Sequence, residues 1–246
     1  MDHTHALVTR PSPQLEELTG LLEKAHLRAV RMPAFRFEAR ERRIVPDEAW
    51  RRESSRLLLF TSPRAVEFGL PALPESMLGE SRVAAIGPAT ARVLAEAGLD
   101  AVQAPGPDFD SEALLETLGE QFEPGAAVIL AAPGGREALQ QGLEAGGWSV
   151  RLVPVYARVL IDPEPEAIET LEAAERVLSF WTSGVALAHI LGKLSERALK
   201  RVRAGTAIVI SERLAGLARD QGIAEVRVAA GPANADLMRC FQQLAH

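Results

Sequence analysis

Small hydroxyl residues, glycines and arginines recur directly after short apolar runs of this chain, and they are the residues best suited to chemistry. Each run would end in a turn before a helix, where free backbone N–H groups can bind an anion. The residues concerned are Arg10, Thr61, Ser62, Arg64, Gly87, Pro88, Thr90, Gly135, Arg136, Thr182, Ser183 and Ser211. Serine and threonine also cap helices, and glycine suits tight turns. Capping is the simpler interpretation of any one turn, whereas six such turns together favour a site for a large polyanion.

Tyr156 is the only tyrosine of the chain, and two interpretations of it stay open. Its phenol could face a cleft as a proton donor, or its ring could simply pack against other apolar groups. Other catalytic signatures do not emerge from the spacing of residues. Gly134 and Gly135 precede Arg136 without the third glycine of a dinucleotide-binding turn, and neither a phosphate-binding lysine loop nor a nucleophile triad is indicated.

Composition excludes several classes of function. Cys240 is the only cysteine, so a disulfide within the chain and a cysteine-based zinc site are both excluded, and the five histidines are scattered. The net charge of −6 argues against a nucleic-acid partner. The first residues lack a secretory signal, and every apolar run is shorter than the ~20 residues needed to cross a bilayer. We therefore expect a cytoplasmic protein without a membrane partner.

The elements that must position these residues follow from hydrophobic periodicity. Short apolar runs alternate with helix-period segments, a pattern typical of an α/β fold with parallel strands covered on both faces. The predicted strands are Ala6–Thr9, Ala29–Met32, Leu57–Phe60, Val83–Ile86, Ala101–Gln103, Ala127–Ala131, Val150–Val153, Val177–Phe180, Ala207–Ile210 and Val226–Ala229. The clearest predicted helices are Gln14–Ala25, Pro88–Ala97, Ser111–Glu120 and Arg136–Ala145. Gly98, Gly146 and Gly222 lie where C-terminal caps belong.

The chain also repeats itself. A first series of five strands, which ends with the segment LDAVQAP before a helix from Ser111, matches in order a second series of five strands. Thr61-Ser62 in the first series corresponds to Thr182-Ser183 in the second. Two similar units of five strands are predicted, either as one domain per half or with strands exchanged between the halves. The alternating segments 35–39 and 153–158 could pair as a two-stranded linker. The charge-dense stretch 36–56 is interpreted as a solvated linker and first helix.

The order of several short motifs resembles the uroporphyrinogen-III synthase family nearly end to end. The motifs are Val8-Thr9-Arg10-Pro11, Phe60-Thr61-Ser62-Pro63-Arg64-Ala65-Val66, Ala85-Ile86-Gly87-Pro88-Ala89-Thr90-Ala91, Gly135-Arg136-Glu137-Ala138-Leu139, Val153-Pro154-Val155-Tyr156-Ala157-Arg158 and Phe180-Trp181-Thr182-Ser183. One departure is the late turn Ser211-Glu212-Arg213, where many relatives have a glycine-containing turn.

The resemblance implies a fold of two flavodoxin-like parallel-sheet domains joined by a two-stranded antiparallel linker. Residues 1–34 and 160–246 would form a discontinuous first domain, and residues 40–152 an inserted second domain. Residues 35–39 and 153–159 would be the linker strands. Such an arrangement would exchange strands between the two halves of a tandem repeat.

The resemblance further implies cyclisation of hydroxymethylbilane, a linear tetrapyrrole with eight carboxylates, to uroporphyrinogen III, without cofactor or metal. Tyr156 matches the family's tyrosine that assists departure of the hydroxyl, and Thr90 matches a threonine at the cleft edge. The other turn residues would bind substrate. A monomer is expected, with transient contact with the preceding pathway enzyme. The alternative function is a non-catalytic two-domain protein that binds an anionic small molecule or regulates through it.

Overall fold

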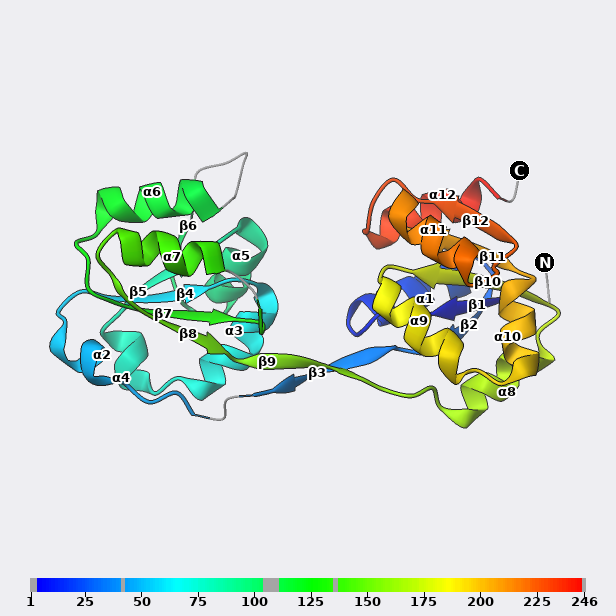
Figure 1. Ribbon diagram of the computed structural model, residues 1–246, viewed down its shortest axis with the longest axis horizontal. Coiled ribbons are helices and arrows are strands. Elements are labelled where there is room, and N and C mark those ends of the chain that lie inside the picture. Colours follow the sequence, from blue (N-terminus) through cyan, green and yellow to red (C-terminus); the bar gives the residue numbers. More distant parts are fainter. Residues whose placement is uncertain (1–3, 41–42, 104–110, 135–136, 245–246) are drawn as a thin grey trace. The chain divides into compact units, whose positions relative to one another are not determined.

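The computed structural model describes residues 4–40, 43–103, 111–134 and 137–244, which divide into two compact units. The first unit comprises Met1–Arg36 and Arg158–His246, and the second comprises Phe37–Ala157 (Figure 1). The second unit is therefore inserted into the first. Each unit contains a five-stranded sheet with helices on its faces.

The sheet of the first unit has the strand order β12-β11-β10-β1-β2, and all neighbouring strands are parallel. Its strands are β1 (Thr4–Val8), β2 (Arg28–Arg31), β10 (Arg176–Trp181), β11 (Thr206–Val209) and β12 (Glu225–Val228). Its helices are α1 (Gln14–Lys24), α8 (Pro165–Ala173), α9 (Gly184–Lys193), α10 (Glu196–Arg203), α11 (Glu212–Asp220) and α12 (Asn234–Gln242).

The sheet of the second unit has the order β6-β5-β4-β7-β8 and is likewise parallel throughout. Its strands are β4 (Arg56–Phe60), β5 (Arg82–Ala85), β6 (Val102–Gln103), β7 (Ala126–Ala131) and β8 (Ser149–Pro154). Its helices are α2 (Glu48–Arg52), α3 (Pro63–Gly69), the 3-10 turn η1 (Leu70–Ala72), α4 (Glu75–Gly79), α5 (Pro88–Glu96), α6 (Ser111–Gln121) and α7 (Glu137–Ala145). The ten predicted strands are confirmed, each within a few residues.

A separate two-stranded sheet pairs β3 (Phe35–Ala39) with β9 (Tyr156–Leu160), the two segments through which the chain passes from one unit to the other. Backbone hydrogen bonds continue the pairing at both ends: Arg40 N donates to Val155 O, and Ile161 N donates to Ala34 O. The predicted fold class, with two parallel-sheet domains and a small antiparallel linker, is confirmed.

The two halves of the repeat exchange strands. The first half contributes β1 and β2 to the sheet of the first unit, and β4, β5 and β6 to the sheet of the second unit. The second half contributes β7 and β8 to the sheet of the second unit, and β10, β11 and β12 to the sheet of the first unit. Each sheet thus combines two strands of one half with three of the other. The alternative with one complete domain per half is excluded.

Burial on both faces explains why the central strands are apolar throughout. In β4, Leu58 and Phe60 join a core on one face of the sheet, while Leu57 and Leu59 join a core on the other. Successive side chains of a strand point to opposite faces, so both sets must be apolar where helices cover both faces. Every residue of the neighbouring strand β7 is buried.

Two local expectations are corrected. The left-handed residue after α7 is Gly147 with φ +87°, not Gly146, because the helix ends at Ala145 and Gly146 lies between the helix and the reversal. The charge-dense stretch before β4 is not simply solvated. Ile44 and Trp50 within it are buried in the core of the second unit, and this apolar pair holds the segment and α2 against the sheet.

Candidate functional site

The turn after β4 lies at the carboxyl edge of the second unit's sheet, and two of its residues have defined polar partners. Thr61 is buried, and both its backbone N–H and its hydroxyl donate to Leu130 O on β7, at 3.1 and 3.0 Å. Ser62 is the N-cap of α3, because its Oγ accepts a hydrogen bond from Ala65 N at 3.1 Å. Thr61 therefore fixes the turn to the neighbouring strand, and Ser62 starts the helix.

The half-buried Tyr156 side chain lies against the start of α3. Its hydroxyl is 3.4 Å from Ser62 Oγ. Its ring meets the edge of Phe37 at a centroid distance of 5.6 Å and stacks on Phe68 at 5.7 Å. The ring is therefore packed, and the phenol oxygen lies beside a polar turn at the carboxyl edge of the sheet. The role of the phenol as a proton donor stays a prediction.

Arg64 extends this cluster with a charge. Its guanidinium lies 4.6 Å from the centroid of the Phe37 ring and forms an ion pair with Glu67 at 2.5 Å. A cation over an aromatic face is attracted by the electron density of the ring. Arg64 is therefore held close to Tyr156 through Phe37, rather than projecting freely from the helix.

The turn after β5 brings an open helix N-terminus to the same edge. Gly87 is the N-cap of α5 and offers no capping side chain, and Pro88 occupies the first helical position. Thr90 follows in the first turn. It is buried. A helix start of this kind can present N–H groups to a carboxylate.

In the first unit, Arg10 follows β1 and is anchored rather than free. Its Nη1 donates to Pro232 O at 2.8 Å and to Asn234 Oδ1 at 2.6 Å. Asn234 is buried at the start of α12 and in turn donates to Glu17. Burial lowers the pKa of the Arg10 guanidinium, and the negative charge of Glu17 opposes this change. Arg10 ties the turn after β1 to the start of α12.

The two serines predicted for the first unit are both helix caps. Ser183 Oγ accepts from Ala186 N at 3.4 Å at the start of α9, and Ser211 Oγ accepts from Leu214 N at 3.3 Å at the start of α11. Thr182 precedes the first of these caps. The unusual turn at Ser211 therefore builds the same helix start as the turn at Ser183, without a glycine.

The parallel strand order brings the predicted residues together within each unit. Thr61, Ser62, Gly87 and Pro88 follow the adjacent strands β4 and β5, and Tyr156 joins them through Ser62. Arg10, Thr182, Ser183 and Ser211 follow the adjacent strands β1, β10 and β11. Gly135 and Arg136 lie outside the described residues. Each sheet thus gathers its own set at its carboxyl edge.

Sequence reasoning missed Phe37 and Phe68 as ring partners of Tyr156, and Asn234 as the partner of Arg10. Phe37 alternates with charged residues in β3, which signalled a strand but not the tertiary contact. Phe68 is one of several apolar residues on α3, and no local pattern distinguishes it from core. Asn234 is the first residue of α12, and no local pattern indicates its contact with Arg10.

The arrangement is suited to holding and protonating an anionic substrate. Helix N-termini and arginines attract carboxylates, and a phenol can give up a proton. Within the described part of the chain, no group of three histidine, cysteine, aspartate or glutamate side chains could hold a metal ion, and no helix could span a membrane.

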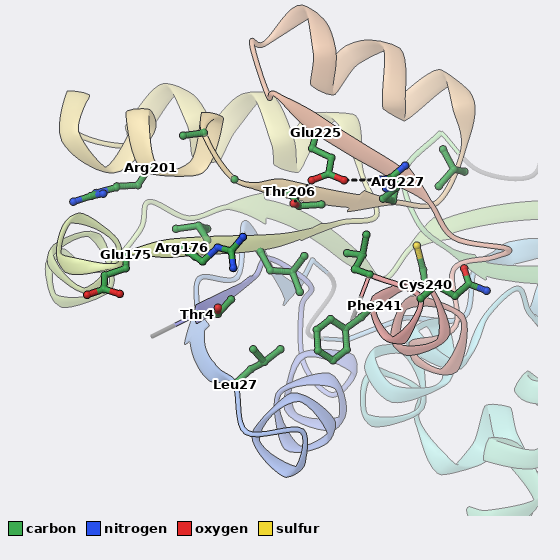
Figure 2. A pocket seen from close by; sticks show the side chains of 17 residues that line it. Thr4, Leu27, Glu175, Arg176, Arg201, Thr206, Glu225, Arg227, Cys240 and Phe241 are labelled. Carbon is green, nitrogen blue, oxygen red and sulfur yellow. Dashed lines mark hydrogen bonds and ion pairs between the residues drawn. The ribbon is translucent and has the colours of Figure 1, made fainter. Parts of the chain in front are cut away.

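A hollow of about 940 Å³ lies elsewhere, at the amino ends of β1, β10, β11 and β12 in the first unit (Figure 2). Some of the polar side chains that line it are paired with one another, because Glu225 accepts hydrogen bonds from Arg227 at 2.6 Å and from Thr206 at 2.9 Å. None of the described site residues lines this hollow. The hollow therefore lies at the amino ends of the first unit's strands, whereas Arg10, Ser183 and Ser211 follow the carboxyl ends of strands in the same sheet.

Comparison with known proteins identifies close sequence relatives. Residues 16–239 match the family described as "HEM4: Uroporphyrinogen-III synthase HemD". The uroporphyrinogen-III synthase of Escherichia coli (strain K12) is 32% identical, over 96% of this chain and 99% of the relative. The uroporphyrinogen-III synthase of Salmonella typhimurium (strain LT2) is 31% identical, with the same coverage of both chains.

A solved structure gives the same picture for the fold. The crystal structure of uroporphyrinogen-III synthetase from Helicobacter pylori 26695 aligns with a TM-score of 0.61, at 17% sequence identity. The alignment covers 98% of this chain and 99% of that chain. The two-unit architecture is thus shared from end to end.

Proposed function

This chain belongs to the uroporphyrinogen-III synthase family, and we propose how its own residues serve the cyclisation that this family catalyses. The enzyme is a lyase of heme biosynthesis. It closes hydroxymethylbilane, a linear tetrapyrrole with eight carboxylates, into uroporphyrinogen III with loss of water and inversion of the last ring.

The enzyme must control which isomer forms more than it must speed up ring closure. Loss of the hydroxyl leaves a reactive azafulvene cation, and the ring can close without enzyme to give the isomer that lacks the inversion. The protein must therefore hold the chain so that only one carbon attacks. Positioning of this kind can lower the barrier by ~7–11 kcal/mol.

In our proposal, Tyr156 is the general acid that protonates the departing hydroxyl. The supporting observation is the position of its phenol oxygen, 3.4 Å from Ser62 Oγ beside the first turn of α3. The hydroxymethyl C–O bond breaks, the electron pair leaves with oxygen, and the phenol proton completes the water molecule. The substrate later releases a proton when the attacked ring regains aromaticity, and this proton restores the phenol.

The carboxylates are held by the turns at the carboxyl edges of the sheets. The starts of α3, α5, α9 and α11 supply backbone N–H groups, and Arg10 and Arg64 add positive charge. Thr90 places its hydroxyl at the start of α5. The other residues assigned to substrate binding are Thr61, Ser62, Gly87, Pro88, Gly135, Arg136, Thr182, Ser183 and Ser211. The proposal includes a cytoplasmic monomer that meets the preceding pathway enzyme only transiently.

The product isomer tests this function directly. The purified chain is given hydroxymethylbilane, the products are oxidised, and isomers I and III are separated. Isomer III should predominate, whereas the heat-denatured chain should yield the spontaneous isomer I. Isomer I alone from the native chain would contradict the proposal and favour a protein that binds an anionic small molecule without chemistry.

A further inference from the structure

We propose that Ser62 is a positioning residue whose hydroxyl donates a hydrogen bond to Tyr156 Oη, so that the phenol keeps its own proton for the substrate. The inference rests on the acid role of Tyr156 proposed above. It assigns to Ser62 a task beyond capping a helix or touching a carboxylate.

The other contact of Ser62 leaves its hydroxyl hydrogen available for a hydrogen bond in this direction. Its Oγ accepts from Ala65 N at 3.1 Å, and a backbone N–H can only donate. The hydroxyl hydrogen of Ser62 is not used in that contact and is free to point at Tyr156 Oη, 3.4 Å away. A hydrogen bond of this length is long, and catalytic hydrogen bonds often tighten when substrate binds.

The ring contacts keep the phenol in place for this hydrogen bond. Phe37 meets the Tyr156 ring edge-on and Phe68 stacks against it, so the ring is restrained by β3 and by α3. Arg64 lies over the Phe37 ring and is paired with Glu67, so a charged pair lies next to this cluster. The phenol oxygen is thus fixed beside a donor, while the phenol hydrogen stays available.

The hydrogen bond matters most after proton transfer. Once Tyr156 has given its proton to the departing hydroxyl, its oxygen is a phenolate, and hydrogen bonds to a charged acceptor are about twice as strong as neutral ones. Ser62 thereby stabilises the charged form that exists only as the C–O bond breaks. Interactions that strengthen in the transition state raise kcat rather than lower KM.

Ser195 provides a matched control because it makes the same two kinds of contact away from Tyr156. Its Oγ accepts from Ala198 N at 3.2 Å as the N-cap of α10, and its hydroxyl donates to Glu172 at 2.5 Å. Replacing either serine with alanine removes one cap and one hydroxyl donor. Only the change at Ser62 should alter the chemical step.

Three variants separate capping from donation. Ser62→Ala loses both, Ser62→Asp keeps a cap but can only accept from the phenol, and Ser62→Thr keeps both. We expect kcat to fall about tenfold in S62A and in S62D, because one charge-assisted hydrogen bond is lost. KM should change less than about twofold in S62A, whereas the added carboxylate of S62D should also raise KM by repelling the substrate carboxylates. S62T should stay within about twofold of wild type, and S195A should keep its kcat.

A double-mutant cycle with Tyr156→Phe gives the decisive result. If Ser62 acts through the phenol, S62A should lower kcat about tenfold in the wild type but hardly at all in Y156F. An equal loss in both backgrounds, or a rise in KM without loss of kcat, would overturn the proposal and leave Ser62 as a cap or a substrate contact. Failure of wild type to form isomer III would instead refute the proposed function itself, and full turnover by Y156F would refute the acid role.

Discussion

At the scale of single residues, Tyr156 combines an apolar body with a polar tip. Two phenylalanine rings contact its ring, and its hydroxyl reaches the capping serine of α3. The ring contacts and the hydroxyl contact are separable, since a phenylalanine would keep the first and lose the second.

Tyr156→Phe should therefore damage catalysis and spare the fold. We expect kcat for isomer III to fall ~10²-fold or more, the scale of a lost general acid, with the product shifting toward isomer I. The thermal melting curve should overlay that of wild type, because the ring and its two neighbours remain. Unchanged turnover with hydroxymethylbilane would remove Tyr156 from the mechanism.

Cys240 is a second residue with a perturbed environment. Burial raises the pKa of its thiol above the ordinary value of 9.0, and the positive charge of Arg227 opposes this change. The folded chain thus holds the thiol proton more tightly than the unfolded chain does. Its contribution to stability is present below the unfolded pKa and is lost as pH rises through the folded pKa.

Urea unfolding at several pH values measures this contribution. The free energy of unfolding of wild type, compared with that of Cys240→Ala, should decrease between neutral pH and about pH 10, because only the wild type carries the linked thiol. The alanine variant corrects for all other titrations. A difference between the two that stays constant, or that grows with pH, would show that the thiol does not titrate as its burial requires.

At the scale of elements, close packing at the strand starts depends on glycine. A Cβ on Gly125, just before β7, would lie 2.1 Å from Ser55 O, and one on Gly205, before β11, would lie 2.1 Å from Val177 O. The atoms contacted are backbone atoms, which cannot move away by rotation of a side chain. In contrast, Gly119 within α6 has nothing within 4 Å of its Cβ position.

Gly125→Ala should destabilise the second unit by about 1–3 kcal/mol, because the backbone must shift to admit the methyl group. Gly119→Ala is the matched control and should stabilise by about 0.5–1 kcal/mol through helix propensity. Chemical denaturation of both variants gives these values. If Gly125→Ala left the free energy of unfolding unchanged, the backbone at the start of β7 would be able to move away from Ser55 at little cost, contrary to this prediction.

The elements also show which features could be predicted from sequence. The central strands were predictable because burial on both faces makes them apolar along their whole length, as in β7. The strand exchange was not decided by the repeat, since either pairing satisfies the same local pattern. Likewise Ser62, Ser183 and Ser211 were identified as residues at helix starts, but the contact with Tyr156 that distinguishes Ser62 depends on tertiary packing.

At the scale of the whole molecule, each unit has its own buried core. Leu58, Phe60 and Val128 belong to a core of the second unit, and Val8, Phe180 and Ile208 belong to a core of the first. Side chains that are packed within one unit stabilise that unit first. The domain boundaries expected from sequence, 1–34 with 160–246 and 40–152, stay a prediction that unfolding experiments can test.

The three tryptophans allow that test. Trp181 lies in the first unit, and Trp50 and Trp148 lie in the second. Leu58→Ala should cost ~2–5 kcal/mol in the second unit, because it leaves a cavity in a fully buried core. The unfolding midpoint should shift when it is followed by Trp50 and Trp148 in a W181F background.

The same substitution should leave the Trp181 midpoint unchanged in a W50F/W148F background. In each tryptophan background, the Leu58→Ala variant is compared with the same tryptophan variant that retains Leu58. Equal shifts in both backgrounds would show that the units unfold as one cooperative body.

The insertion of one unit into the other has a consequence for how the protein is made. The strand β1 leaves the ribosome early, yet its partner β10, paired from Thr4 with Arg176, is translated only after the entire inserted unit. At ~5–20 residues per second, this nascent strand waits on the order of 10 s for its neighbour. Meanwhile Phe37–Ala157 emerges as one continuous stretch and can complete its own sheet. We therefore expect the second unit to fold before the first during synthesis. The apolar strand β1 must be kept from aggregating until β10 has been translated.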